Sequence, residues 1–252
     1  MGAKPQLFTC LSPALIPLYD LSNTIVVVID IFRATSTICA ALDNGAKAVI
    51  PVATVEECLR LEKEQPRFMT AGERDGKVIE GLQGGNSPSE YLPEVISGKV
   101  LALTTTNGTR LLHLVKEADE IVIGSFLNLD VLCQYLVNSG KDILLACAGW
   151  RDKENLEDTL FAGAVIQRID EYFQRSCDSS FIALSLYRQS QEAASLLDFM
   201  KSGSHYHRLS QFHLEQDMAY CCSINKHPVV PIFKDPFLVP QQAISLTEIE
   251  NF

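Results

Sequence analysis

The stretch VVIDIFRATST, residues 27–37, contains residue types suited to phosphate chemistry. Asp30 ends an apolar run, Arg33 follows three positions later, and three small hydroxyl residues come next: Thr35, Ser36 and Thr37. A carboxylate can ligate a cation, and an arginine can hold an oxyanion through two parallel hydrogen bonds. Small residues at a helix start let an anion approach unpaired backbone N–H groups. The stretch therefore predicts a site for a phosphate or a comparably anionic substrate.

Polar residues also follow the later apolar runs of the chain. They are Glu73 and Arg74; Thr105, Asn107, Gly108 and Thr109; Gly124 and Ser125; and Gly149, Trp150 and Arg151. Ligands of parallel α/β sheets bind beyond the carboxyl ends of the strands. The repeated placement of such residues after apolar runs therefore predicts one shared binding or catalytic pocket, with Arg33 and Arg74 as oxyanion ligands.

Carboxylates suitable for a metal ion accompany these groups. Asp30, Glu157 and Asp158 offer hard oxygen atoms, and Mg²⁺ typically uses one or two carboxylates together with oxygens of a bound phosphate. We predict Mg²⁺ as the cofactor, with these three residues as its ligands and with Asp30, Arg33, Glu73 and Arg74 as catalytic residues.

Each of these features also has a purely structural interpretation. Asp30 can cap a helix, Glu73 and Arg74 can form an ion pair, and Asn107 with Gly108 is a common turn pair. The histidines at 205, 207 and 213 carry no metal-protease or zinc motif, so we interpret their segment as a solvated or partly packed helix, and His113 and His227 as structural.

The elements that must position these residues alternate along the chain. Apolar runs at 24–30, 48–52, 68–73, 99–106, 120–125 and 142–149 predict strands, and the segments between them have helical patterns. A capping box predicts a helix at 54–64, and another, with Ser87 as N-cap, Pro88 first and Glu90 at N3, predicts a helix from 88.

Regular alternation of short strands and helices predicts a three-layer α/β/α fold. The sheet is mostly parallel, and a C-terminal extension of helices and strands packs on it. We expect one domain over 1–252, with a subdivision near 175 left open. The apolar stretch at 181–200 predicts a helix that either covers the sheet or contacts a second copy of the chain in a homodimer.

The composition limits the partners of the protein. Its 252 residues carry a formal net charge of −10, and no run of Lys or Arg offers a local basic patch, which disfavours nucleic acid and anionic membranes. No apolar segment is long enough to cross a bilayer, so we expect a cytoplasmic protein. The eight cysteines form no C-x-x-C pair and predict buried, reduced thiols.

Known phosphate-binding motifs are missing from the sequence. It contains neither G-x-x-x-x-G-K-[ST] nor G-x-G-x-x-G, and no cysteine is followed by an arginine six positions later. Asp30 follows a strand like the nucleophile of haloacid-dehalogenase-type phosphatases, but Phe32 stands where that family has a second aspartate.

Six segments taken together resemble the 2-phosphosulfolactate phosphatase family. They are VVIDIFRATST, AGER, GNSPSE, TTTNGT, IGSFLN and AGWRDKENLEDTLFAGAV, in this order, and the similarity runs from about Asn23 to the end of the chain. The resemblance implies an α/β fold and Mg²⁺-dependent hydrolysis of 2-phosphosulfolactate to sulfolactate, a step of coenzyme M synthesis. It places these residues at motif positions around the site: Asp30, Arg33, Glu73, Arg74, Asn86, Thr105, Asn107, Glu157 and Asp158.

These observations lead to one main hypothesis and two alternatives. The main hypothesis is a Mg²⁺-dependent phosphatase for a small phosphorylated acid, in which a metal-activated water or Asp30 itself attacks phosphorus. The expected substrate-binding residues are Thr35, Ser36, Thr37, Asn86, Ser87, Thr105, Asn107, Gly108, Thr109 and Trp150. The alternatives are a non-catalytic anion or metabolite sensor and a phosphoryl-transferring enzyme on the same fold, although no nucleotide-binding motif supports the latter.

Overall fold

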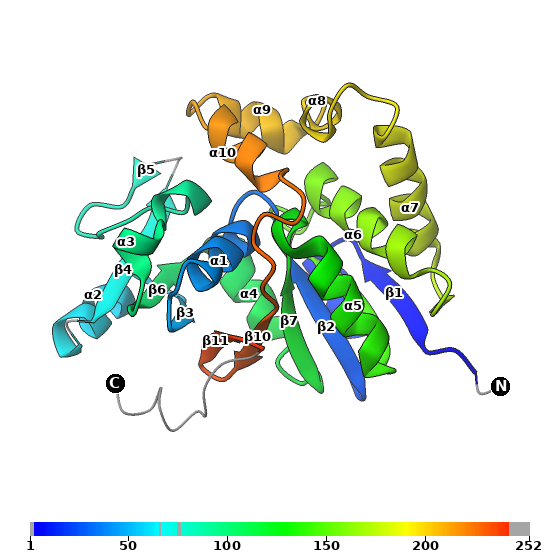
Figure 1. The fold of residues 1–252 in the computed structure, drawn as a ribbon, viewed down its shortest axis with the longest axis horizontal. Coiled ribbons are helices and arrows are strands. Elements are labelled where there is room, and N and C mark those ends of the chain that lie inside the picture. The colour runs from blue at the N-terminus through cyan, green and yellow to red at the C-terminus, as the bar shows by residue number, and fades with distance from the viewer. Residues whose placement is uncertain (1–2, 66, 75–76, 242–252) are drawn as a thin grey trace.

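The computed structural model of the chain describes residues 3–65, 67–74 and 77–241, and for Thr106 and Asn107 it describes the backbone only. The described residues form one eleven-stranded sheet flanked by helices (Figure 1). Its strands are β1 (Gln6–Cys10), β2 (Thr24–Ile29), β3 (Ala48–Val52), β4 (Phe68–Arg74), β5 (Lys77–Val78), β6 (Val100–Thr104), β7 (Glu120–Gly124), β8 (Asp142–Cys147), β9 (Gln174–Arg175), β10 (Pro231–Lys234) and β11 (Phe237–Pro240).

The α-helices are α1 (Ala34–Asp43), α2 (Val55–Glu64), α3 (Pro93–Ile96), α4 (Thr106–Leu114), α5 (Leu129–Ser139), α6 (Leu156–Ile169), α7 (Asp178–Ser190), α8 (Leu196–Met200), α9 (Ser204–Ser210) and α10 (Glu215–Cys221). Three short 3₁₀ helices accompany them: η1 (Pro13–Leu18), η2 (Pro88–Glu90) and η3 (Phe126–Asn128). The predicted α/β class with a mostly parallel sheet is confirmed.

The central strand β2 pairs in parallel with β7 on one side and β8 on the other. Val28 lies opposite Ile123 of β7 and Ala146 of β8, so the residues that follow these three strands meet at one edge. On the other half of the sheet, Gly72 of β4 lies opposite Thr104 of β6. The register therefore aligns the polar residues that the sequence places after each of these strands.

The C-terminal hairpin of β10 and β11 lies inside the sheet, between β3 and β7. It is antiparallel to both neighbours, and each contact has one paired position: Leu238 with Val49, and Ile232 with Val122. The hairpin thus joins two parallel groups, β4-β6-β3 and β7-β2-β8-β1. The predicted C-terminal extension thus contains strands, but they lie within the sheet, whereas the prediction has them packed on it. The sequence pattern predicts no strand for β1 at the N-terminal end.

Alternation along β2 divides its side chains between two cores. Ile25, Val27 and Ile29 pack in a cluster with residues of α5, α6 and α7. Val26 and Val28 pack in a second cluster with residues of α1 and α4. A third, smaller cluster lies between α2 and strands β3, β4 and β6. Burial on both faces explains why β2 is apolar throughout.

Two predicted helices are wrong in extent. Ser87 makes no capping hydrogen bond, and only the 3₁₀ turn η2 follows it before α3 begins at Pro93. Proline disfavours the helical conformation in the residue before it, which accounts for the interruption at Leu92. The predicted helix over 181–200 is likewise interrupted, because α7 ends at Ser190 and α8 begins at Leu196.

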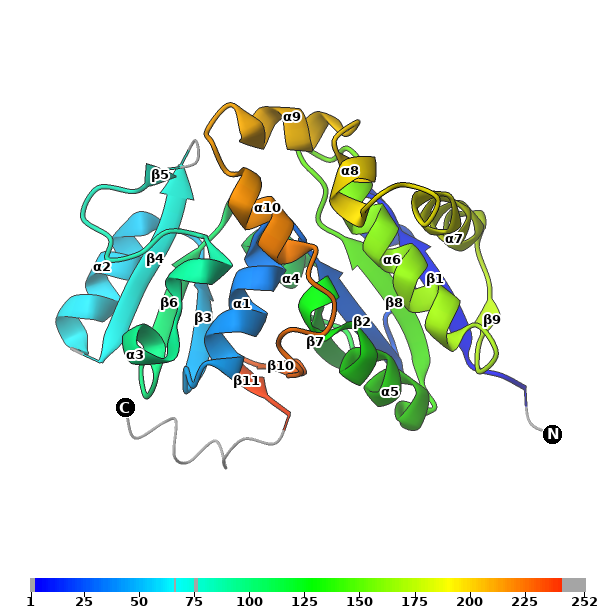
Figure 2. The ribbon, with the colours of Figure 1, turned by 45° about the horizontal axis from the view of Figure 1, so that its top comes forward.

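Helices α8, α9 and α10 pass over the carboxyl edge of the sheet, above the start of α1 (Figure 2). All eight cysteines are free thiols, as predicted, and six of them are buried. Among the described residues, none of the helices combines the length and apolar composition that a membrane span requires.

Candidate active site

Asp30 lies directly after β2 and is 8% exposed. Hydrogen bonds fold the turn after it back on itself: Thr35 Oγ1 donates to the Asp30 carbonyl at 2.9 Å, and the Asp30 N–H donates to Thr35 Oγ1 at 3.2 Å. The Thr35 N–H also donates to the same carbonyl at 3.0 Å. These bonds fix the Asp30 carboxylate at the start of α1.

The hydroxyls of Ser36 and Thr37 also serve the protein itself. Ser36 Oγ donates to the Ile31 carbonyl at 2.9 Å and contacts Ser125 Oγ at 2.9 Å, and Thr37 Oγ1 donates to the Asn86 carbonyl at 3.2 Å. Thr35, Ser36 and Thr37 are all at most 1% exposed. The structure therefore places these three residues as supports of the site, where the sequence predicts substrate contacts.

Asp158, in the first turn of α6, connects the ends of two strands. Its Oδ1 accepts the Ile31 N–H at 2.9 Å and its Oδ2 accepts the Gly149 N–H at 3.1 Å. Both oxygens thus bind backbone groups, one after β2 and one after β8. This residue holds the two strand ends together beside Asp30.

Glu157 is buried beside Asp158 and pairs with a histidine from α9. His205 Nδ1 contacts Glu157 Oε1, and Asn155 Nδ2 lies 3.1 Å from the same ring nitrogen. His205 is 7% exposed whereas His207 is exposed, so of the two alternatives for this segment the partly packed helix is the one observed. Helix α9 closes over the carboxyl edge, which brings residues 157 and 205 together although 48 positions separate them.

The carboxylates of the site perturb one another. Burial raises the pKa of Asp30 to about 6; His205 opposes the rise, whereas Glu157 and Glu73 add to it. Burial, and then the charges of Glu157 and Asp30, raise the pKa of Asp158 well above its usual range. Such mutual destabilisation of negative charge is what a bound cation would relieve.

Arg33 is buried beside the carboxylate cluster and pairs with two acidic groups. Its Nη1 lies 2.5 Å from Asp217 Oδ2 on α10, and its Nη2 lies 3.7 Å from Glu73 Oε2 at the end of β4. Ser87 Oγ donates to Asp217 Oδ1 at 2.7 Å. Asp217 therefore connects the GNSPSE segment to Arg33.

The start of α4 lies directly against Asp30. A Cβ atom added to Gly108 would lie 3.6 Å from Asp30 Oδ2 and 3.3 Å from the Ala34 Cβ, so the starts of α1 and α4 converge on the carboxylate. Thr105 Oγ1 lies 3.5 Å from Thr109 Oγ1 within this turn. The predicted side-chain role of Asn107 falls outside the described side chains.

Two predicted site residues have more exposed positions. Arg74 is exposed on β4, and because successive strand residues point to opposite faces, it points away from the side on which Glu73 meets Arg33. Trp150 is half-buried after β8, where the guanidinium groups of Arg151 and Arg208 stack on its ring.

Two observations test whether the site fits Mg²⁺. Among the described residues, Asn86 Oδ1 is a buried side-chain acceptor without a hydrogen-bond partner. Over the same residues, no set of three His, Cys, Asp or Glu side chains forms a ready-made metal site. Mg²⁺ needs only one or two carboxylates besides water and phosphate oxygens, so Asp30 and Glu157 fit this ion without a third acidic ligand.

Sequence reasoning missed three residues of this region: His205, Arg208 and Asp217. All three come from the short helices α9 and α10, outside the βα units whose strand ends carry a recognisable signal. The spacing of His205 and Arg208, three positions apart on one helix, is the only local sign that they share a face.

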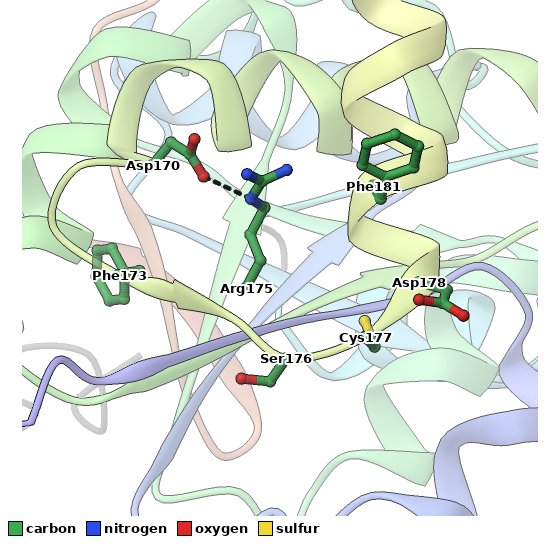
Figure 3. Close-up of a pocket in the computed structure, with 7 residues that line it drawn as sticks. All are labelled: Asp170, Phe173, Arg175, Ser176, Cys177, Asp178 and Phe181. Carbon is green, nitrogen blue, oxygen red and sulfur yellow. Dashed lines mark ion pairs between the residues drawn. The ribbon is translucent and has the colours of Figure 1, made fainter.

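A surface hollow of about 610 Å³ lies beside β9, the outermost strand on one side of the sheet, next to the start of α7 (Figure 3). Arg175 points toward Asp170 there, with Nε 2.8 Å from Oδ1. None of the carboxylates near Asp30 lines this hollow.

Comparison with known proteins identifies similar chains. A family model described as 2-phosphosulpholactate phosphatase matches residues 10–236. A protein of Caldanaerobacter subterraneus subsp. tengcongensis named probable 2-phosphosulfolactate phosphatase is 42% identical over 219 residues, which cover 86% of this chain and 90% of the relative. A protein of the same name from Thermotoga petrophila is 42% identical, and the match covers 81% of this chain and 87% of the relative. One from Microcystis aeruginosa is 35% identical, and the match covers 93% of this chain and 98% of the relative.

Proposed function

The chain belongs to the 2-phosphosulfolactate phosphatase family, and from this premise we propose that it hydrolyses 2-phosphosulfolactate to sulfolactate and phosphate with the help of Mg²⁺. Family membership confirms the predicted enzyme class, a phosphoric monoester hydrolase. The substrate named for the relatives carries three acid groups on a three-carbon chain, and the arginines near this edge of the sheet, Arg33, Arg151 and Arg208, suit such an anion.

One observation carries the proposal. Asp30 and Glu157 lie near one another at the carboxyl edge of the sheet, where the starts of α1 and α4 converge on the Asp30 carboxylate, and Arg33 pairs with the neighbouring Glu73. Helix starts and guanidinium groups attract a phosphate, and buried carboxylates attract the cation that accompanies it. The combination suits phosphoryl transfer to water.

Asp30 and Glu157 are the residues that we propose to hold the metal ion. The third predicted ligand, Asp158, has both carboxylate oxygens on backbone N–H groups and is better suited to positioning the other two. Asn86 Oδ1 is an additional oxygen available to the ion or to the substrate. Bound Mg²⁺ supplies positive charge to the phosphate oxygens and acidifies a water molecule.

In the proposed reaction an oxygen atom attacks phosphorus and the bond from phosphorus to the oxygen on carbon 2 breaks. The sulfolactate oxygen leaves with the electron pair and takes up a proton. Asp30 either accepts the proton of the attacking water or attacks phosphorus itself, in which case a water molecule then hydrolyses the aspartyl phosphate and releases phosphate. The remaining N–H groups of Arg33, which Asp217 and Glu73 hold in place, stabilise the charge that develops on the phosphate oxygens.

Phosphate release from 2-phosphosulfolactate, with Mg²⁺ and with a chelator, tests the proposal. We expect hydrolysis that stops when the metal is removed. Asp30→Asn should reduce kcat by at least a thousandfold, and the exposed Asp20→Asn should not change it. Full activity in chelator would overturn the Mg²⁺ requirement. Binding of the substrate without phosphate release by the wild type would instead support a non-catalytic anion sensor.

A further inference from the structure

Two arginines from distant segments stack on the same tryptophan. The guanidinium carbon of Arg151 lies 4.4 Å from the centroid of the Trp150 ring, and that of Arg208 lies 4.6 Å from it. Arg151 follows Trp150 in the loop after β8, whereas Arg208 comes from α9, which passes over the sheet edge (Figure 2). Cation–π contacts of this kind restrain the orientation of both guanidinium groups.

The loop that carries Trp150 is itself held in place. The Trp150 N–H donates to the Lys153 carbonyl at 2.9 Å and the Lys153 N–H returns a hydrogen bond at 3.1 Å. Ser12 Oγ donates to the Asp152 carbonyl at 2.7 Å, and Arg110 pairs with the Asp152 carboxylate at 2.8 Å. The tryptophan is thus a fixed support for the two arginines.

The two arginines make no ion pair within the described part of the chain. Arg33, Arg110, Arg168 and Arg175 each have a carboxylate within 4.0 Å, whereas Arg151 and Arg208 have none at that distance among the described residues. The two guanidinium groups also repel one another. An anion that binds their hydrogen-bond donors would offset this repulsion.

The arginine pair lies close to the carboxylate cluster without contacting Asp30. Arg208 lies three positions after His205 on α9, and His205 contacts Glu157. Trp150 directly follows Gly149, whose N–H donates to Asp158 Oδ2 at 3.1 Å. A group bound to Arg208 therefore lies at the same edge of the sheet as the phosphate that we place at Asp30.

We infer that Trp150, Arg151 and Arg208 form a second anion subsite. It binds the sulfonate or carboxylate of the substrate, which remains on the product after phosphate is released. This inference rests on the proposed function, because it assigns the phosphate itself to the site at Asp30. The subsite selects phosphomonoesters that carry an additional acid group. A free phosphate ion or a neutral phosphorylated alcohol does not use it.

A comparison of two substrates tests the subsite. 2-Phosphosulfolactate and glycerol 2-phosphate both carry a phosphorylated secondary alcohol, but only the former has additional acid groups. We expect Arg208→Ala to lower the ratio of their kcat/KM values at least tenfold, mainly through KM, and Arg151→Ala to act in the same direction. Arg208→Lys should restore part of the ratio. The control Arg175→Ala removes a paired arginine beside the distant hollow and should leave the ratio unchanged.

Three outcomes would overturn the subsite: an unchanged ratio, an equal loss on both substrates, or a loss confined to kcat. Thermal unfolding of each variant checks that it folds. If Arg208→Ala does not fold, Arg151→Ala serves as the second variant, because Arg151 is exposed. Calorimetric binding of sulfolactate, which has no phosphate, gives an independent result: its Kd should rise at least tenfold in Arg208→Ala. If the wild type hydrolyses neither ester, the proposed function fails, and sulfolactate binding still decides the subsite.

Discussion

At the scale of a single residue, the buried Asp30 carboxylate lowers the stability of the folded protein when it is ionised. The chain buries this carboxylate beside Glu157 and raises its pKa to about 6, so its ionised form is unfavourable without a cation. In the unfolded chain the ordinary value of 3.8 applies. The Asp30 carboxyl therefore binds its proton more tightly in the folded state than in the unfolded state. The stability that this protonation contributes is fully present below pH 3.8 and is lost as pH rises through about 6.

The first prediction concerns this loss. In metal-free buffer, Asp30→Asn should stabilise the protein by about 3 kcal/mol at pH 8, since each unit of pKa shift corresponds to about 1.4 kcal/mol. The gain should shrink as pH falls and approach zero below about pH 3, where the wild-type carboxyl is protonated in both states. Urea unfolding at several pH values measures the difference. A gain that stays constant with pH would contradict the assignment.

The second prediction concerns His205. Its removal leaves Glu157 buried with its histidine partner missing, and an unsatisfied buried acceptor costs about 1–3 kcal/mol. His205→Ala should lower the free energy of unfolding by this amount, as measured in urea. His207→Ala is the matched control, because His207 is exposed on the same helix and should change stability by less than about 0.5 kcal/mol. Equal effects of both variants would show that the contact with Glu157 contributes nothing.

At the scale of elements, α10 completes a site that the βα units begin. Asp217 joins the buried Arg33 to Ser87, so one carboxylate connects α10, the turn after β2 and the segment before η2. Because the two partners lie far apart in the chain, neither has a local sequence signal for the pairing.

The third prediction follows from this connection. Asp217→Ala leaves the Arg33 guanidinium buried with one partner removed, which should cost about 3 kcal/mol of stability and at least tenfold in kcat/KM. Asp198→Ala is the control: its ion pair with Lys201 is exposed on α8 and should contribute less than about 1 kcal/mol. Thermal unfolding and phosphate release measure both variants. Unchanged kcat/KM in Asp217→Ala would show that Arg33 needs no support from α10.

At the scale of the whole molecule, the C-terminal hairpin joins two parallel half-sheets. It occupies the position between β3 and β7, so the last described strands of the chain lie near the centre of the sheet. The two halves carry different parts of the site, with Glu73 at the end of β4 on one and Asp30 after β2 on the other. The hairpin therefore fixes the distance between them.

The fourth prediction tests this junction. Leu238 of β11 is fully buried, and Leu238→Ala should cost about 2–5 kcal/mol, since the cavity left behind adds to the lost burial. Leu18→Ala, at a position that is 79% exposed, should change stability by less than about 0.5 kcal/mol. Urea unfolding compares the two. A small loss for Leu238→Ala would show that the half-sheets hold together without the hairpin.

Much of the fold and part of the site were predictable from local pattern. Strands β2, β3, β6, β7 and β8 are mostly apolar runs. Asp30 directly follows β2, Glu73 lies at the end of β4 and Gly149 lies just after β8, which is a signal that parallel topology creates. The substrate contacts of Thr35, Ser36 and Thr37 stay a prediction. Their hydroxyls donate to backbone carbonyls, and residue type alone does not reveal these bonds because the acceptors are placed by the fold.

The sequence by itself determined the α/β class, the strand ends that carry polar residues and the family, because these depend on residue order and short-range periodicity. Only the tertiary structure decided that His205 meets Glu157, that Asp217 meets Arg33 and that Arg208 stacks on Trp150. The physical reason is the path of α8 to α10 across the sheet edge. Contacts between segments so far apart depend on how the whole chain packs, and no local pattern encodes them.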